Sequence, residues 1–283
     1  MSFDDLPQLP QLIHPDGGRY LERIMRLGRR AQRETRCLLD QPYGSDYWQK
    51  LDVYLPAVNS GPGIPVLCFL PGGAWINGCK EWLAFMAPVL TALPSVFVAL
   101  SYRHAPASRF PAQLDDTIEG LCWIYRNVSR WGGDPRRIFL GGHSAGGHLA
   151  ALASLRRDAI EAHGLPRDIV RACLPVSAPY DLASDDPVRR QKVAGFLARP
   201  EDVRAASPIA HVGGSTPFVV TCGSVDLPEL IPQARLMTSA LRDAGNPAEL
   251  LILEGRNHFN THEDCGVADS PWVRSLAAFL REG

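Results

Sequence analysis

The 283-residue sequence lacks any apolar run long enough to cross a bilayer. A spanning helix needs roughly 20 apolar residues, whereas the longest candidates here, such as SVFVAL, have the length of a strand. The opening stretch MSFDDLPQLPQLIHPDGG is acidic and broken by prolines, so it lacks the basic flank and apolar centre of a signal peptide. We therefore expect a cytoplasmic protein with no membrane partner.

A charge excess of either sign is also missing, because 29 basic residues face 30 acidic ones. Nucleic-acid-binding proteins normally carry a basic excess or a cationic stripe. The one basic cluster, RYLERIMRLGRRAQRETR, has the pattern of a solvated amphipathic helix. No nucleic-acid partner is expected.

The seven cysteines are scattered and include no CxxC pair. That spacing argues against a zinc site and against a disulfide framework. We expect small buried thiols, no metal and no cofactor.

Short apolar runs alternate with helical periodicity along most of the chain. A helix near residues 17–36 precedes two strand-like runs, 36–43 and 50–56, and turn-forming residues between these runs predict an antiparallel hairpin. Further strands are predicted at 65–72, 95–103, 137–144, 171–181, 218–224 and 249–255, and further helices near 80–93, 112–130, 145–157, 229–244 and 270–282.

Nearly continuous apolar strands that alternate with helices belong in a mostly parallel sheet covered on both faces. We predict one α/β domain over residues 1–283, with eight strands. Residues 1–36 form a leader and helix that act as a cap element. The irregular stretch 182–214 is either a lid over the site or a surface excursion, and we slightly favour the lid.

The stretch FLGGHSAGGHLA places one serine between glycines, after a strand and before a helix. A sharp strand-to-helix turn strains its apex residue and needs small neighbours. Gly142 and Gly146 supply that space, and Ser144 is the apex, next to a helix N-terminus that favours developing negative charge. Ser144 is therefore the predicted nucleophile.

A serine hydroxyl needs a base to take its proton, and the base needs an orienting acid. Asp226 follows the strand FVVTCGS, and His258 follows ELLILEG, so both are predicted at strand ends in the order Ser, Asp, His. Glu229 is the alternative acid, three residues away. The competing histidines are less suitable, because His143 and His148 lie on the elbow and His104, His211 and His262 follow no suitable strand end.

Acyl transfer also needs donors for a tetrahedral oxyanion. The stretch FLPGGAWING ends a predicted strand, and its glycines Gly72 and Gly73 allow the amides of Gly73 and Ala74 to point inward. The amide of Ala145 would be a third donor. By itself this stretch is interpreted equally well as a simple glycine-rich turn.

Together these pieces resemble the α/β-hydrolase superfamily, in the branch with an HGGxW-type oxyanion loop that contains hormone-sensitive-lipase-like carboxylesterases and kynurenine formamidases. The motifs run from YGSDYWQKLDVYLP through PGGAW, SYRHAPASRFPAQLDD, GGHSAGGHLA and SAPYDL to NHFN. PYDL, GSVDLPELIPQARLM and NHFNTHED are closer to the formamidases, and YRHAP is closer to the esterases. Pro71 stands where the loop of the family usually has histidine, so the loop must be held differently.

The resulting hypothesis is a metal-independent serine hydrolase that cleaves a carboxylic ester or an aryl formamide, with Ser144 as nucleophile, His258 as base and Asp226 as orienting acid. Trp75 and His143 are predicted to contact the substrate. A formamidase acting on N-formylkynurenine is the chemical alternative, and a non-catalytic ligand-binding protein on the same fold is the alternative of a different class. The sequence leaves the oligomeric state open, and a homodimer is one expectation.

Overall fold

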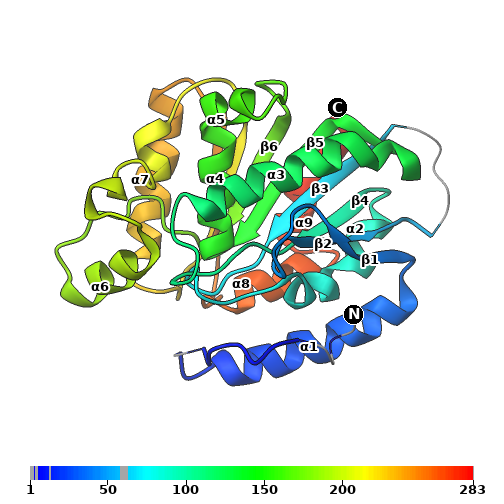
Figure 1. Cartoon of the computed structure of the whole chain (residues 1–283), viewed down its shortest axis with the longest axis horizontal. Coiled ribbons are helices and arrows are strands. Elements are labelled where there is room, and N and C mark those ends of the chain that lie inside the picture. Colours follow the sequence, from blue (N-terminus) through cyan, green and yellow to red (C-terminus); the bar gives the residue numbers. More distant parts are fainter. Residues whose placement is uncertain (1–2, 4–5, 13, 58–62, 283) are drawn as a thin grey trace.

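An eight-stranded sheet forms the centre of the computed structural model, which describes residues 3, 6–12, 14–57 and 63–282 (Figure 1). Within these residues the spatial order is β1-β2-β4-β3-β5-β6-β7-β8. The strands are β1 (Cys37–Pro42), β2 (Lys50–Tyr54), β3 (Ile64–Leu70), β4 (Val96–Leu100), β5 (Gly133–His143), β6 (Val170–Val176), β7 (Phe218–Gly223) and β8 (Ala248–Leu253).

The predicted hairpin is present, since β1 pairs antiparallel with β2, and β2 pairs antiparallel with β4. All the remaining neighbours are parallel. The predicted mostly parallel α/β sheet is therefore confirmed. Because parallel strands end at one edge, the loops after β3, β5, β7 and β8 gather at that edge.

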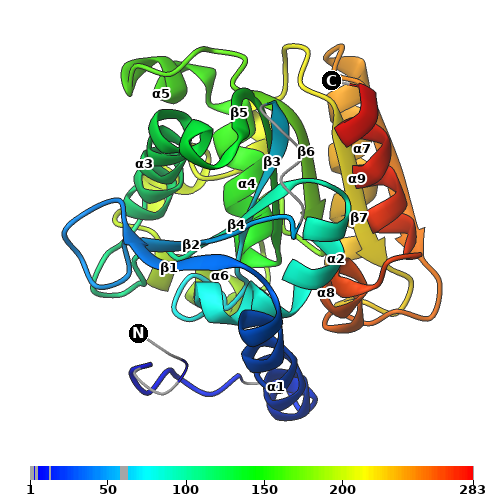
Figure 2. The same ribbon diagram turned by 90° about the vertical axis from the view of Figure 1, so that its right-hand side faces the viewer.

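Alternate residues of the central strand β3 enter two separate hydrophobic cores. Val66, Cys68 and Leu70 face the core that includes helices α3 (Ala112–Asn127), α4 (Ala145–Leu155) and α7 (Leu230–Asp243). Leu67 and Phe69 face the core that includes α1 (Gly17–Glu34), α2 (Ala87–Ala92) and α9 (Pro271–Glu282). The period-two alternation explains why every residue of β3 is buried and why both faces of the sheet need helices. Figure 2 shows the sheet between these layers.

Several element boundaries differ from the sequence prediction. The predicted helix at 80–93 is a 3-10 helix, η1 (Lys80–Met86), followed by the short α2, whose Pro88 lies in the first helical turn, where its missing N–H costs no hydrogen bond. The strand predicted at 171–181 ends at Val176, because the backbone of Ser177 takes a positive φ of 50°.

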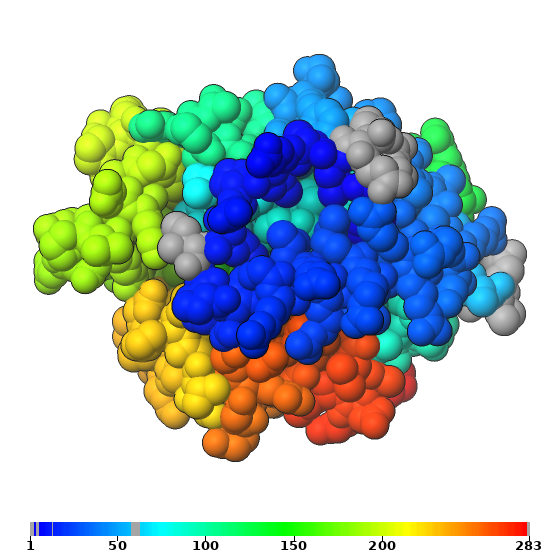
Figure 3. Space-filling view, turned by 90° about the horizontal axis from the view of Figure 1, so that it is seen from below, coloured from blue at the N-terminus to red at the C-terminus, as the bar shows by residue number. Residues whose placement is uncertain are grey.

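The N-terminal part of the chain lies along one side of the molecule and ends in α1, which packs against η1. Figure 3 shows this part, in dark blue, arching across the face that it covers. Of the predicted leader, residues 1, 2, 4, 5 and 13 lie outside the described residues.

The stretch 182–214 contains α6 (Pro187–Phe196), the 3-10 helices η3 (Pro200–Val203) and η4 (Pro208–His211), and loops between them. α5 (Arg157–Ala162) and α8 (Asn260–Glu263) complete the α-helices of the described chain. None of the described helices is both long and apolar enough to span a membrane. Six of the seven cysteines are buried, Cys37 is half-buried, and all are free thiols.

Candidate active site

Ser144 stands at a sharp turn between β5 and α4, with φ 52° and ψ −119°. A Cβ added to Gly142 would lie 2.3 Å from the backbone of Gly146, and one added to Gly146 would lie 2.2 Å from the carbonyl oxygen of Leu70. No side chain fits at these distances. The two glycines thus allow strand and helix to approach closely enough to hold the serine in its strained position.

The three residues predicted as a triad meet at the carboxyl edge of the sheet. Nε2 of His258 lies 3.1 Å from Oγ of Ser144, and Nδ1 of His258 lies 2.9 Å from Oδ1 of Asp226. Since an ionised carboxylate only accepts, Nδ1 carries the proton and Nε2 offers its lone pair to the serine hydroxyl. The alternative acid, Glu229, is exposed at the start of α7 and has no contact with the histidine.

Asp226 is buried, and burial alone would raise the pKa of its carboxyl. The hydrogen bond and charge of His258 oppose this effect, as do hydrogen bonds from the Ser177 hydroxyl and the Leu227 amide, and the net result is a pKa below the usual value. The carboxylate stays ionised, as the orienting role requires.

His143 packs beside the triad. Its Nε2 donates to the backbone carbonyl of His258 at 2.8 Å, and its ring stacks on that of His262 with 4.8 Å between centroids. Burial, together with the neighbouring His258 and His262, keeps the pKa of His143 well below the usual value. His143 forms no hydrogen bond with Ser144 among the described residues, whereas Nε2 of His258 does, so the geometry agrees with the choice of His258.

The loop after β3 has an unusual backbone. Gly73, Ala74 and Trp75 have positive φ values of 129°, 52° and 62°. The amides of Gly73 and Ala74 donate no hydrogen bond to any described residue, and Ala145 is the first residue of α4, where an N–H has no partner within the helix. The N–H groups of these three residues are therefore available as donors beside the serine, as an oxyanion site requires.

Gly72 explains how the loop comes so close to the nucleophile. A Cβ on Gly72 would lie 2.8 Å from Nδ1 of His143 and 3.1 Å from Cβ of Ser144. A larger residue at this position would push the loop away from the serine.

Other side chains brace this loop where the family usually uses histidine. The hydroxyl of Tyr102 donates to the carbonyl of Pro71 at 2.9 Å, and Nε2 of His104 lies 2.8 Å from the carbonyl oxygen of Gly78. Both bracing residues come from the loop after β4. The sequence prediction missed them, although the motif SYRHAP contains both.

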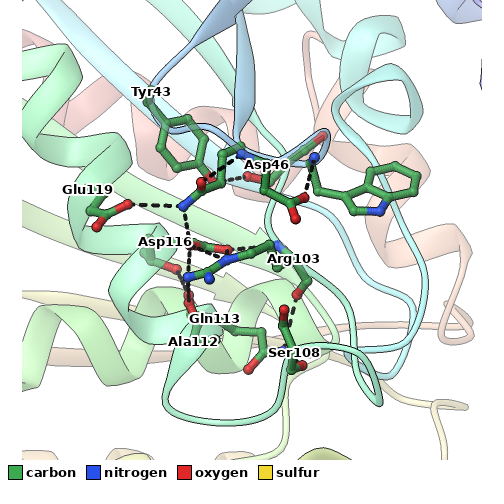
Figure 4. Close-up of polar contacts among 12 residues, drawn as sticks. Tyr43, Asp46, Arg103, Ser108, Ala112, Gln113, Asp116 and Glu119 are labelled. Carbon is green, nitrogen blue, oxygen red and sulfur yellow. Dashed lines mark hydrogen bonds and ion pairs between the residues drawn. The ribbon is translucent and has the colours of Figure 1, made fainter.

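The loop after β4 is itself fixed by an ion pair between a half-buried arginine and a buried aspartate, shown in Figure 4. Asp116 of α3 accepts from the Arg103 side chain at 2.6 Å and from the Arg103 amide at 2.8 Å. Gln49 also donates to this carboxylate, and Gln113 donates to the carbonyl of Arg103. The hydrogen bonds tie the turn before β2, the loop after β4 and α3 together.

Trp75 is predicted from the sequence to contact the substrate. Its ring is buried, stacks on Phe196 of α6 with 4.4 Å between centroids, and donates to His148. It is absent from the described lining of the cavity at Ser144. The side chain of Trp75 therefore packs toward the core, and its contact with the substrate stays a prediction.

A cavity of about 230 Å³ opens at Ser144 and His258. Its lining combines the oxyanion loop and the triad with residues of the N-terminal segment and of α6. The residues are Gln11, Leu12, His14, Tyr20, Gly72, Gly73, Ala74, Ile76, Asn77, Trp82, His143, Ser144, Lys192, Leu227, His258 and Phe259. Both predicted cap elements thus contribute to the wall, the first through residues 11–20 and the second through Lys192.

The N-terminal segment is attached to this site by several contacts. The side-chain amide of Asn77 donates to the carbonyl of Pro10, and the ring of Tyr20 stacks on Phe259 with 4.5 Å between centroids. The hydroxyl of Tyr20 lies 2.6 Å from Nδ1 of His262. Phe259 and His262, which follow His258, therefore anchor the N-terminal segment beside the cavity.

The strand order and the serine elbow between β5 and α4 define the α/β-hydrolase fold. The sequence profile of the BD-FAE family matches residues 51–241, and the chain belongs to that family.

Two relatives are similar to the chain over most of its length. It is 33% identical to Esterase LipC of Mycobacterium tuberculosis (strain ATCC 25618 / H37Rv) over 257 residues, which cover 85% of the chain and 64% of the relative. It is 30% identical to Isoprenylcysteine alpha-carbonyl methylesterase ICME of Arabidopsis thaliana over 235 residues, which cover 76% and 55%. The chain thus spans a little over half of the length of these relatives.

Solved structures share the fold. A putative thioesterase from Silicibacter sp. superposes with a TM-score of 0.79 at 22% identity, covering 95% of both chains. An esterase of Pyrobaculum calidifontis superposes with a TM-score of 0.76 at 21% identity, covering 96% of this chain and 95% of the other. The two curated relatives above are named as esterases, so they lend no support to the formamidase alternative.

Proposed function

We propose that the protein is a carboxylic ester hydrolase that works through an acyl-enzyme on Ser144. The supporting observation is the continuous hydrogen-bonded chain from Oγ of Ser144 through the His258 ring to Asp226. The esterase names of the relatives agree with this function.

In the first half of the reaction, Ser144 Oγ attacks the ester carbonyl while Nε2 of His258 takes the hydroxyl proton. Asp226 holds the imidazole by Nδ1 and stabilises the positive charge that forms on it. The carbonyl oxygen becomes negative and is bound by the amides of Gly73, Ala74 and Ala145, which is the role predicted for them. The protonated histidine then gives its proton to the departing alkoxide, and the alcohol leaves.

In the second half, water enters where the alcohol was. His258 takes a proton from the water as it attacks the acyl carbonyl, and the same amides bind the second oxyanion. Collapse of this intermediate returns the proton to Ser144 and releases the acid. No step needs a metal or an organic cofactor.

The size of the cavity favours small esters. Pockets for drug-sized ligands measure roughly 300–1,000 Å³, whereas the cavity at Ser144 measures about 230 Å³. We propose that residues 1–36 and the stretch 182–214 together limit the space over the serine and act as caps. Acetyl and butyryl esters should therefore be hydrolysed better than long-chain esters. N-formyl aryl amides could follow the same route, but no observation in the structure favours them.

Fluorophosphonate labelling combined with turnover of p-nitrophenyl acetate tests the function. We expect labelling and turnover in the wild type, and loss of both in Ser144→Ala. Ser239→Ala, which removes an exposed hydroxyl on α7, is the matched control and should retain both. A wild-type chain that neither labels nor turns over any ester would contradict the proposal and favour a binding protein. The cytoplasmic location and the homodimer stay predictions, which cell fractionation and gel filtration would check.

A further inference from the structure

Ser177 is a second serine held in a strained backbone at the edge of the sheet. It follows the last residue of β6 with φ 50°, and it is completely buried. A non-glycine residue rarely takes this conformation, which costs free energy that glycine avoids. The presence of serine here needs a reason, and strained residues of this kind cluster at functional sites.

The hydroxyl of Ser177 forms the shortest hydrogen bond to the carboxylate of Asp226, with Oγ 2.5 Å from Oδ2. The other donors to the carboxylate are the ring of His258 at 2.9 Å, the amide of Leu227 at 2.8 Å, the amide of Gly223 at 3.2 Å and the thiol of Cys222 at 3.5 Å. The Ser177 hydroxyl is therefore a main determinant of how Oδ2 is held, while the His258 ring uses Oδ1.

A second contact of Ser177 is with the hydroxyl of Thr261. Its Oγ lies 2.7 Å from Oγ1 of Thr261, and that hydroxyl lies 2.9 Å from the carbonyl oxygen of His258. Ser177 has one hydroxyl proton and donates it in the hydrogen bond to the carboxylate. Thr261 must therefore be the donor in the contact between the two hydroxyls. The carbonyl of His258 keeps a partner in this arrangement, because His143 donates to it at 2.8 Å.

From this network we infer that Ser177 is a positioning residue for the catalytic acid, and that Thr261, which donates to the Ser177 hydroxyl, fixes the direction of that hydroxyl. The acid is thus held at both oxygens, by the His258 ring at Oδ1 and by the Ser177 hydroxyl at Oδ2. The inference rests on the proposed ester hydrolysis, because it assigns a role relative to that triad. Ser177 touches neither the nucleophile nor the substrate cavity in the described residues.

Ser177→Gly separates this role from a structural one. Glycine relieves the positive φ, so the melting temperature should equal or exceed that of the wild type. The loss of the hydroxyl should nevertheless lower kcat about tenfold, the value of one charge-assisted hydrogen bond, with little change in KM. The pH profile of kcat/KM should also change, because a carboxylate that has lost its shortest hydrogen bond is more basic.

Further variants and a spectroscopic signal complete the test. Ser177→Ala should lose as much kcat as Ser177→Gly but melt at a lower temperature, and Thr261→Val should show a smaller loss in the same direction. Ser154→Ala removes another buried hydroxyl, which bonds to Ala150 of α4 and contacts Cys173 of β6, and should leave kcat unchanged. The low-field proton signal of the hydrogen bond between His258 and Asp226 should shift in Ser177→Gly and not in Ser154→Ala, which tests positioning without turnover.

The outcomes distinguish this inference from the proposed function. If the wild type is active and Ser177→Gly keeps its kcat, pH profile and proton signal, the inference is overturned and the function stands. If Ser177→Gly does not fold, an unchanged kcat, pH profile and proton signal in Thr261→Val would overturn it equally. If the wild type itself turns over no ester, so that Ser144→Ala has no activity to lose, the proposed function is wrong.

Discussion

The indole N–H of Trp75 donates to Nδ1 of His148 at 3.1 Å, while the other ring nitrogen of His148 lies 2.7 Å from the carbonyl oxygen of Ala206. Only a neutral ring that accepts at Nδ1 and donates at Nε2 can make both bonds. Trp75 belongs to the oxyanion loop, His148 to the helix behind the nucleophile, and Ala206 to the stretch 182–214. The imidazole of His148 therefore connects the stretch 182–214 to the loop after β3.

Because burial lowers the pKa of His148 to about 4, this connection predicts acid lability. An unfolded histidine titrates near 6.5, so the unfolded chain gains a proton first, and stability that is complete above about pH 6.5 is lost as the pH falls toward 4. At pH 5 the loss from this residue is about 2 kcal/mol. His148→Gln keeps a donor and an acceptor but does not titrate. The difference between its free energies of unfolding in urea at pH 7.5 and pH 5 should be about 2 kcal/mol smaller than in the wild type. An identical pH dependence in both proteins would contradict the role of His148.

A second prediction concerns the oxyanion loop. Gly73 has φ 129°, and a Cβ there would lie 2.3 Å from the carbonyl oxygen of Asn77. Gly73→Ala should displace the amides of the loop and lower kcat by about 100-fold or more, as loss of an oxyanion donor does, with a small effect on KM. Gly195→Ala on α6, where an added Cβ meets no atom within 4 Å, is the matched control. Equal kcat in the two variants would exclude this loop as the oxyanion site.

The central fold and the meeting of Ser144, Asp226 and His258 could be predicted from the sequence because both depend on local patterns. Apolar runs of strand length, the glycines around Ser144 and the strand ends before Asp226 and His258 each have a direct physical meaning. The hairpin followed for the same reason. These predictions did not require knowledge of contacts between distant segments.

The parts that the sequence could not predict depend on contacts between distant segments. Tyr102 and His104 brace the loop that lacks the usual histidine, but nothing in SYRHAP indicates which carbonyl each contacts. Trp75 has a positive φ and turns into the core, and no residue pattern around it predicts that conformation. Ser177 lies in a stretch predicted as a strand, and its strain becomes evident only from the backbone.

A third prediction concerns the length of the acyl or alcohol group. Leu12 of the N-terminal segment lines the cavity. Leu12→Ala should widen it and raise kcat/KM for octanoyl relative to acetyl p-nitrophenyl esters about tenfold, since added methylenes in an apolar pocket are each worth roughly 1 kcal/mol or more. Leu9→Ala, in the same segment but outside the described lining, is the control. A ratio that changes equally in both variants would indicate a general loosening of the segment rather than a wall at Leu12.

The last prediction concerns charge in the substrate. Lys192 of α6 lines the cavity, no carboxylate lines it among the described residues, and Lys192 has no ion-pair partner in that part of the chain. Esters with a carboxylate in the acyl group, such as hemisuccinates, should therefore be favoured over neutral esters of equal length. Since the lysine is exposed, the gain is that of a screened pair, about two- to fivefold in kcat/KM. It should shrink as the salt concentration rises.

Two variants of equal charge change isolate this effect. Lys192→Gln should remove the preference for the hemisuccinate and leave neutral esters unaffected, whereas Arg190→Gln, on the same helix but outside the described lining, should change neither. Lys192→Glu should invert the preference, because a carboxylate at the cavity repels an anionic acyl group. If Lys192→Gln and Arg190→Gln lower the hemisuccinate rate equally, the attraction comes from the overall charge of α6, and the assignment to Lys192 is wrong.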